Sequence, residues 1–344
     1  MTTTKSFWSN KRVFVTQPTG FLGTWVVKAL LAKNAQVFGF GEAPATETNL
    51  FDLENLGQKI SMTFGDLRDE AVLREALSFA QADVVIHLGE SGLLQEAQAR
   101  ALETFSKAAL GAATLMELMR ETASVRAVVV VSSDKVYARK TSPDAYTEED
   151  RVAASAILPT AKLCSELIAM SYRQTFFAPE KYNKHKIAIA TARMGSAIGG
   201  GDFTEQALIP QAVKAFVAGE AFTLRNPQSL RPWIAVQDQV EGLLALAEGL
   251  IEKGPKLAAS YNFGPSEVHA VGEVARILAE EWGAKAQLSL NEEIKSTPSR
   301  HGELNSHLAK QDLGWEPQRN LQNTLKETIQ WYKEFYSSAT SAKL

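Results

Sequence analysis

Short runs of apolar residues alternate with longer helical patterns through the first half of the chain. The apolar runs predict strands at 11–15, 36–40, 59–64, 83–88, 127–133 and 186–192. The longer patterns predict helices that end near 33 and that span about 95–121 and 155–174. Continuous apolar strands are typical of parallel sheets whose two faces are both covered by helices. The pattern therefore predicts an α/β domain built from βαβ units.

The second half of the chain is less regular. Glycines at 199–201 and prolines at 210, 227, 232 and 265 separate shorter elements, and helical patterns recur at 205–218, 236–252, 267–282 and 320–336. We predict a Rossmann-type doubly wound parallel sheet in residues 1–190 and a smaller C-terminal α/β substrate lobe in residues 191–336, with some chain crossing back. A flexible tail is expected at 337–344.

Composition narrows the class of protein. With 344 residues the chain is long enough for about two domains, and its 45% hydrophobic and 22% charged residues are ordinary for a globular protein. A net charge of −3 argues against a nucleic-acid or membrane-surface partner. Cys164 is the only cysteine, which excludes an internal disulfide and fits a cytoplasmic location. The last residues, Ala342-Lys343-Leu344, resemble a peroxisomal address or form a polar tail that ends this way by chance.

A turn with two glycines follows the first predicted strand (TQPTGFLG, 16–23). In a dinucleotide-binding turn, glycines permit the tight turn, the close approach of a diphosphate and the packing of helix on strand. Gly20 and Gly23 fill the second and third places, but Gln17 fills the first. A side chain at position 17 is expected to strain the turn or to protrude toward the phosphates. A helix N-terminus near Phe21 still favours an anion.

Acidic residues follow the second and third predicted strands. A carboxylate after the second strand would hold an adenosine ribose, but Ala43 occupies that place and the nearby Glu42 is interpreted as a solvated loop residue. Asp66, which Leu67 follows, comes after the third strand. It is expected either to bind an adenine amine or to cap the next helix.

Ser133, Asp134 and Lys135 follow the fifth predicted strand, at the sheet edge where ligands of open α/β sheets bind. Ser133 could bond a sugar hydroxyl, and Asp134 and Lys135 could serve as acid and base in an elimination. An ordinary turn is the alternative. Arg231 could clamp a diphosphate or form a surface salt bridge. His87 is expected to be structural, because no partner lies at metal-ligand spacing, and no metal site is expected.

Taken together, these motifs resemble the CDP-glucose 4,6-dehydratases, a group of extended short-chain dehydrogenases/reductases. The segments that carry the resemblance extend over nearly the whole chain and include GDLRD, SSDKVY, KLCSELIA, RMGSAIGGGDF, LRNPQSLRPW and NFGP. The resemblance implies a homodimer built through helices near 95–120 and 155–174, bound NAD and a nucleotide-sugar substrate such as CDP-glucose. Hydride would pass to NAD, water would leave, and hydride would return.

The resemblance also assigns roles to residues. The implied catalytic residues are Ser133, Asp134, Lys135 and Lys162; the implied cofactor residues are Gly20, Phe21, Gly23, Asp66, Leu67 and Lys162; and the implied substrate residues are Arg193, Ser196, Arg231 and Asn262.

Several positions that differ from the pattern of these dehydratases are positions to which that pattern assigns catalysis or cofactor binding. Leu158 stands where the catalytic tyrosine is expected, four residues before Lys162 and on the same helix face. In the resembling enzymes the lysine lowers the pKa of that phenol, which then acts as the base. Gln17, Glu90, Ser91, Ala108, Ser196 and Ala235 also differ from the pattern, and the segment SRHGELN has no clear counterpart.

Three hypotheses follow. The favoured one is a non-catalytic or repurposed paralogue that keeps a nucleotide-sugar pocket and acts as a binding or assembly partner, with itself or with an active relative. The second is an active NAD-dependent nucleotide-sugar dehydratase or epimerase in which Asp134, Lys135 or Tyr137 replaces the tyrosine. The third is a different reaction without NAD, in which Glu90 is the acid or base.

Overall fold

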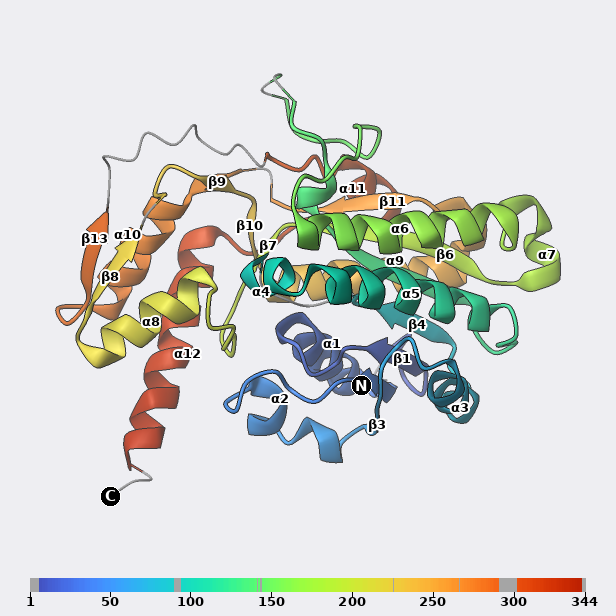
Figure 1. The fold of residues 1–344 in the computed structure, drawn as a ribbon, viewed down its shortest axis with the longest axis horizontal. Helices are drawn as coiled ribbons and strands as arrows, with labels where there is room; N and C mark the ends of the chain where they lie inside the picture. The colour runs from blue at the N-terminus through green and yellow to red at the C-terminus, as the bar shows by residue number, and fades with distance from the viewer. Residues whose placement is uncertain are drawn as a thin grey trace, which may run out of the picture.

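In the computed structural model, a parallel sheet forms the centre of the molecule (Figure 1). The structure describes residues 6–89, 94–140, 142, 144–224, 226–265, 267–290 and 302–341, so the C-terminal tripeptide and Glu90 and Ser91 lie outside the described part. Within that part the strand order is β11-β6-β5-β4-β1-β2-β3. The bounds are β1 (Arg12–Thr16), β2 (Gln36–Gly41), β3 (Ser61–Phe64), β4 (Val84–His87), β5 (Ala127–Ser133), β6 (Ala188–Met194) and β11 (Ser260–Phe263).

Alternate residues of β1 face two separate cores, which is the pattern of a sheet covered on both sides. Val13 and Val15 belong to a core beneath α1 (Phe21–Ala32) and α9 (Val236–Lys253), and Phe14 belongs to the opposite core. Phe14 stacks on Phe40 with ring centroids 6.1 Å apart. Burying each ring stabilises the fold by about 1.5–3 kcal/mol. The predicted doubly wound Rossmann-type sheet is confirmed.

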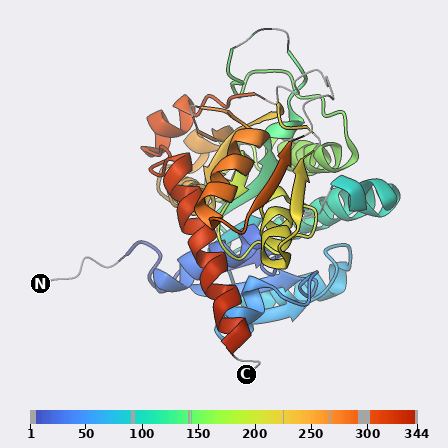
Figure 2. The same ribbon diagram turned by 90° about the vertical axis from the view of Figure 1, so that its left-hand side faces the viewer.

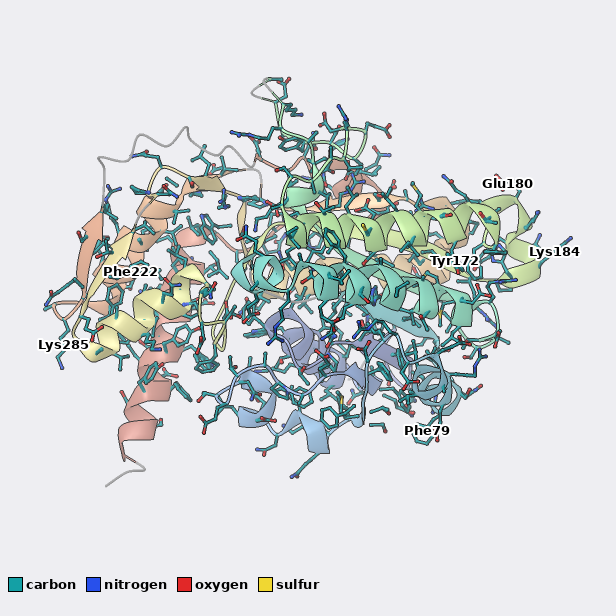
Figure 3. The ribbon with its side chains drawn as sticks, in the orientation of Figure 1. Phe79, Tyr172, Glu180, Lys184, Phe222 and Lys285 are labelled. Atoms are coloured by element: carbon teal, nitrogen blue, oxygen red, sulfur yellow. The ribbon has the colours of Figure 1, made fainter. Side chains whose placement is uncertain are left out.

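Helices α3, α5 and α6 cover the second face of the sheet. Their bounds are α3 (Glu70–Ala80), α5 (Ala101–Met119) and α6 (Ile157–Thr175). The single helix predicted at 95–121 is wrong, because Arg100 has a non-helical backbone and separates α4 (Leu94–Ala99) from α5. Helices α5 and α6 lie side by side (Figure 1), and Figure 3 labels Tyr172 on α6. The hydroxyl of Tyr172 donates to Glu117, on α5, at 2.9 Å.

The second half of the chain contributes both to the central sheet and to a separate group of elements. Helix α9 and strand β11 return to the sheet, and the division expected at residue 190 stays a prediction. The remaining elements form three small two-stranded sheets with three helices: β7 (Ser196–Ile198) with β10 (Trp233–Ala235), β9 (Leu230–Arg231) with β12 (His269–Ala270), β8 (Ala221–Leu224) with β13 (Gln287–Leu290), and α8 (Leu208–Ala218), α10 (Val271–Trp282) and α12 (Leu321–Ser341).

Short elements complete the chain. Glycines with positive φ follow several of the described helices: Gly219 follows α8 with φ of 70°, and Gly314 follows α11 (His307–Leu313) with φ of 69°. Figure 2 shows α12 running along the face turned to the viewer toward the C-terminus. The short helices are α2 (Leu50–Leu53), α7 (Tyr182–His185) and α11 (His307–Leu313), and the 3₁₀ turns are η1 (Leu56–Gln58), η2 (Asp134–Val136), η3 (Pro179–Lys181) and η4 (Gly254–Leu257).

Candidate active site

The turn between β1 and α1 keeps a glycine-like path although its first residue is a glutamine. Gln17 has φ of 51°, in the left-handed region that favours glycine. A Cβ added to Gly23 would lie 2.3 Å from the carbonyl oxygen of Gln17, so the helix packs closely on the turn. Gly20 caps α1 and Phe21 begins it. The free amides of this helix end therefore still point toward a phosphate position, while Gln17 holds backbone strain of about 1 kcal/mol.

The side chain of Gln17 extends over the end of β2. Its Oε1 accepts a hydrogen bond from the backbone amide of Glu42 at 3.4 Å, and lies 2.6 Å from where a Cβ on Gly41 would be. In dinucleotide-binding sheets the end of this strand holds the adenosine ribose. The glutamine amide therefore occupies the ribose position.

Two ion pairs close the neighbouring adenine corner. Lys107 pairs with Glu42 at 2.5 Å, and Arg68 binds both carboxylate oxygens of Asp66. The hydrogen bond from Arg68 holds the pKa of Asp66 below its usual range. Gln17, Glu42, Asp66, Leu67 and Lys107 line a hollow of about 10 Å³, the space of roughly one water molecule. In this arrangement the Gln17 side chain and the two ion pairs narrow the adenosine corner of the site.

The interpretation of Asp66 as a helix cap is wrong. The N-cap of α3 is Asp69, whose side chain accepts from the amide of Val72. Asp66 instead accepts from the amide of Arg68 at 2.9 Å and holds the Arg68 guanidinium, which also binds Glu103. The carboxylate of Asp66, which was expected to bind adenine, is therefore held by both the backbone amide and the guanidinium of Arg68.

Leu158 and Lys162 lie one turn apart at the start of α6, both half-buried. Lys162 lies close enough to His87 for its charge to contribute to the low pKa of that imidazole. The lysine therefore faces the ends of the central strands. Leu158 offers no hydroxyl or other titratable group at the place of the expected base.

Buried polar atoms without partners gather at the ends of β4 and β5. They are Nε2 of His87, Oγ of Ser132 and Oδ2 of Asp134. The hydroxyl of Thr16 accepts from the amide of Leu88 at 3.2 Å and shares a hydrogen bond with Nδ1 of His87 at 3.0 Å, so only Nε2 of this imidazole lacks a partner. Unpaired buried groups of this kind cost about 1–3 kcal/mol each. Their position marks where the polar groups of a ligand would be accepted.

The loop after β5 holds the predicted trio in a defined order. Ser133 caps η2: its hydroxyl donates to Oδ1 of Asp134 at 2.9 Å and accepts from the amide of Lys135 at 3.2 Å. Asp134 is only 4% exposed. This leaves one oxygen of the Asp134 carboxylate for a ligand, as noted above.

Arg231 and Ser196 reach the same region from the other lobe. Burial lowers the pKa of Arg231, and the charge of Asp134 raises it, which places the guanidinium near that carboxylate. One guanidinium nitrogen donates to the carbonyl of Leu230 at 2.9 Å. Ser196, at the start of β7, is half-buried and bonds through its amide to Pro232 at 2.8 Å. The structure thus brings Asp134, Arg231 and the strand beside Ser196 together.

Arg193 and Asn262 belong to a buried network. Arg193 pairs with Glu166 at 2.6 Å and donates to the hydroxyl of Tyr137 at 2.9 Å, and that hydroxyl donates to Asn262 at 2.6 Å. The backbone amide of Asn262 also donates to the carboxylate of Glu148 at 2.7 Å. Arg193 is 5% exposed and Asn262 is fully buried. Their polar groups are engaged with protein partners, so their assignment to substrate stays a prediction.

Tyr137 is poorly suited to replace the missing base. Burial raises its pKa to about 12, and its ring stacks on Tyr146 with centroids 4.8 Å apart. A phenol of this pKa stays protonated near neutrality. Two other departures are packing positions: Ala108 and Ala235 are buried, and the carbonyl of Ala108 accepts from Ser165 on α6 at 2.8 Å.

The sequence did not single out Lys107, Arg68, Glu166 or Glu148 as parts of this region. Glu166 follows Lys162 by four residues, so the helical spacing could have placed both on one face of α6. Lys107 pairs with Glu42, and Arg68 with Glu103, across sequence separations that no local pattern reveals. Among the described residues, no group of three or more His, Cys, Asp or Glu could hold a metal ion. None of the described helices is both long and apolar enough to cross a bilayer.

Comparison with known proteins defines the class. Residues 13–264 match the NAD dependent epimerase/dehydratase family, and the chain belongs to that family. The chain is 31% identical to CDP-glucose 4,6-dehydratase of Salmonella typhimurium over 331 residues, which cover 96% of this chain and 92% of that protein. It is 23% identical to dTDP-glucose 4,6-dehydratase of Escherichia coli, with 93% of each chain covered.

Solved structures share the fold. A dTDP-glucose 4,6-dehydratase from Bacillus anthracis, in complex with NAD, superposes with a TM-score of 0.78 at 21% identity, covering 95% of this chain and 98% of that one. A UDP-glucose 4-epimerase from Thermotoga maritima, with UDP-glucose, gives a TM-score of 0.79 at 19% identity, with 94% and 99% covered. NAD is therefore the cofactor expected from the family. At these identities the similarity to the solved structures establishes the fold alone.

Proposed function

We propose that this chain is a nucleotide-sugar-binding paralogue of the CDP-glucose 4,6-dehydratases that no longer performs their NAD-dependent reaction. The observation that carries the proposal is Leu158, one helical turn before Lys162 on α6. Loss of a general base costs roughly 10²–10⁴ in rate. The filled adenosine corner at Gln17 supports the same conclusion independently, since without a bound dinucleotide no hydride acceptor is present.

The sugar-nucleotide half of the site supports a binding role. Ser133 contacts Asp134, and Arg231 lies near the same carboxylate, which fits the sugar and diphosphate contacts that the resemblance implies for these residues. Arg231 would hold the diphosphate through its planar fork of donors. The unpaired Oδ2 of Asp134 and Nε2 of His87 would accept from and donate to sugar hydroxyls. In the family, bound NAD supplies reversible hydride transfer. In this chain, the turn at Gly20 and Gly23 is the part that would still contact the diphosphate of NAD.

We further propose that helices α5 and α6 form a dimer interface, with a second copy or with an active relative. Leu102, Leu110 and Leu167 are exposed on these helices by 85%, 57% and 42%. Exposed large apolar side chains on two helices that pack side by side favour an interaction surface there. Assembly through this surface would let a non-catalytic chain act as a structural partner.

An active enzyme with a substitute acid and base is the second candidate. The buried Asp134, with one free oxygen, and the neighbouring Lys135 are the residues that favour it. Tyr137 is the least suited of the three substitutes, because of its raised pKa. The third hypothesis rests on Glu90, which lies outside the described residues.

Calorimetric titration of nucleotide-free protein with NAD and, separately, with CDP-glucose tests the proposal. We expect binding of CDP-glucose and no measurable binding of NAD. Turnover of CDP-glucose that disappears in both Asp134→Ala and Lys162→Ala would overturn the proposal and establish the substitute-base enzyme. Binding of neither ligand would remove the nucleotide-sugar role and leave assembly as the function.

A further inference from the structure

A second cavity lies between the N-terminal half and the C-terminal helix, and none of its lining residues belongs to the candidate active site. Its volume is about 520 Å³, within the roughly 300–1,000 Å³ of small-molecule sites. Its walls are the loop at 46–48, the loop at 202–205, helix α8 and helix α12. Figures 1 and 2 both show α8 beside α12, with the C-terminal part of α12 extending past the lobe.

Aromatic rings from α12 and from the loop after β7 form one side of this cavity. Phe203, Tyr332, Phe335 and Tyr336 all line it. Phe203 meets Phe335 edge-on with centroids 5.3 Å apart, and Phe335 meets Tyr336 edge-on at 5.1 Å. Rings that stand nearly perpendicular to one another present both faces and edges to a shared space. A ring face that borders the cavity could bind an ammonium group placed within about 6 Å of it.

Carboxylates outnumber cations along the same cavity. Glu47, Asp202 and Glu205 line it, against the single lysine Lys214. Glu47, Glu205 and Lys214 are exposed, so solvent screens them and Asp202 is the carboxylate that matters most.

Asp202 precedes Phe203 in the chain and contacts Tyr332. Its Oδ1 accepts from the amide of Thr204 at 3.0 Å, and its backbone carbonyl accepts from the hydroxyl of Tyr332. Burial raises the pKa of Asp202, because removal from water disfavours the charged carboxylate. A cation placed against Asp202 would stabilise the charged carboxylate.

We propose that this cavity binds a small organic cation, an ammonium group with an apolar body, held by the rings of Phe335 and Tyr336 and by the carboxylate of Asp202. An anionic ligand would face three carboxylates and only one exposed lysine, and a neutral ligand would leave Asp202 uncompensated. Because the cavity walls come from both halves of the chain, the bound cation would fasten α12 to the loop at 46–48. This site is independent of the proposed nucleotide-sugar function.

Choline and its uncharged carbon analogue 3,3-dimethyl-1-butanol, which has the same shape, test the proposal on the full chain. Calorimetry and ligand-observed NMR should show saturable binding of choline and at least about tenfold weaker binding of the alcohol. Asp202→Asn keeps an acceptor for the Thr204 amide and removes the charge, so choline should bind about tenfold more weakly. Tyr336→Leu should weaken binding in the same direction.

Glu334→Gln is the matched control, because it removes one carboxylate from the same helix outside this cavity. It should leave choline binding unchanged, and circular dichroism should show all three variants folded. Lys214→Gln should tighten binding. No saturable choline binding, equal binding of the alcohol, or equal affinities for Asp202→Asn and the parent would each overturn the proposal.

Discussion

The side-chain oxygen of Gln17 accepts a hydrogen bond from the backbone amide of Glu42 at 3.4 Å. This contact joins the turn after β1 to the end of β2 and places a protein amide where an adenosine ribose is held in related sheets. The backbone of Gln17 nevertheless keeps a left-handed conformation with φ of 51°. The turn has therefore retained the path of a dinucleotide site while its first side chain obstructs that site.

Replacing this side chain should restore part of the cofactor site. Gln17→Gly removes the side-chain amide from the end of β2, and we expect calorimetry to detect saturable NAD binding to this variant where the parent shows none. The unfolding free energy should change by less than about 1 kcal/mol, since relief of left-handed strain opposes the greater freedom of glycine in the unfolded chain.

Gln81→Gly is the control for backbone strain, because Gln81 is also left-handed, with φ of 41°, at the end of α3. It should change stability in a similar way and leave NAD affinity unaltered. An unchanged NAD affinity in Gln17→Gly would show that the adenosine site is blocked elsewhere, with the Glu42–Lys107 pair as the next residues to test.

Restoring the phenol should restore chemistry only when the cofactor can bind. Leu158→Tyr puts a hydroxyl one turn before Lys162. Alone it should give no reduced nicotinamide with NAD and CDP-glucose. Together with Gln17→Gly it should give transient reduced nicotinamide, read by stopped-flow absorbance, because the hydride leaves the sugar for NAD before it returns. The general base is expected to contribute about 10²–10⁴ in rate.

Leu167→Tyr on the exposed face of α6 is the matched control and should have no effect on this reaction. If the single variant Leu158→Tyr were active with NAD, the cofactor site would be functional in the native chain and the ribose obstruction would be irrelevant.

Stability should fall in acid because of His87. Burial, with a smaller contribution from the charge of Lys162, lowers the pKa of this imidazole from 6.5 to about 4. Since the folded pKa lies below the unfolded one, the unfolded chain binds the proton first as pH falls. The stability attributable to His87 is therefore complete above about 6.5 and is lost progressively down to about 4, by about 3 kcal/mol in total.

Denaturant unfolding across this pH range measures the loss. In His87→Gln the pH dependence should be shallower by about that amount, whatever the variant's stability at neutral pH. His307→Gln, at an exposed histidine, should follow the parent. Parallel curves for the parent and His87→Gln would mean that His87 is protonated, or exposed, in the folded protein.

The sequence predicted the sheet well because its physical basis is local. The runs of valine and alanine in β5 and the glycines of the first turn specify strand and turn within a few residues. The break at Arg100 was missed because its neighbours keep a helical pattern on both sides. Helix α6 and its Leu158–Lys162 spacing were predicted because residues four apart share a face in any helix.

The site was only partly predictable, because its missing parts depend on contacts between distant segments. Lys107 reaches Glu42 across 65 positions, and Asn262 reaches Tyr137 across 125. Asn262 has 0% exposure, so its polar groups form hydrogen bonds with protein partners. No local pattern distinguishes such an asparagine from one that faces a ligand.

Charges placed on α5 should disrupt the proposed dimer. Leu102→Glu with Leu110→Glu puts two carboxylates on side chains that are 85% and 57% exposed, so the folded monomer should tolerate them. Sedimentation should show a dimer for the parent and a monomer for the double variant. Phe64→Glu, at an exposed phenylalanine at the end of β3, should remain dimeric. If the parent protein sediments as a monomer when it is measured alone, the proposed homodimer is wrong.

The Arg193–Glu166 pair should matter for stability rather than for ligand binding. Both side chains are under 10% exposed, and Arg193→Met leaves the Glu166 carboxylate buried without its partner. Such a loss typically costs about 3–5 kcal/mol. Lys310→Met, which breaks a surface pair with Glu316, should cost less than about 1 kcal/mol. Denaturant unfolding gives both values, and CDP-glucose titration below the transition gives the affinity. An Arg193→Met protein of normal stability that no longer binds CDP-glucose would return Arg193 to the substrate site, where the resemblance had placed it.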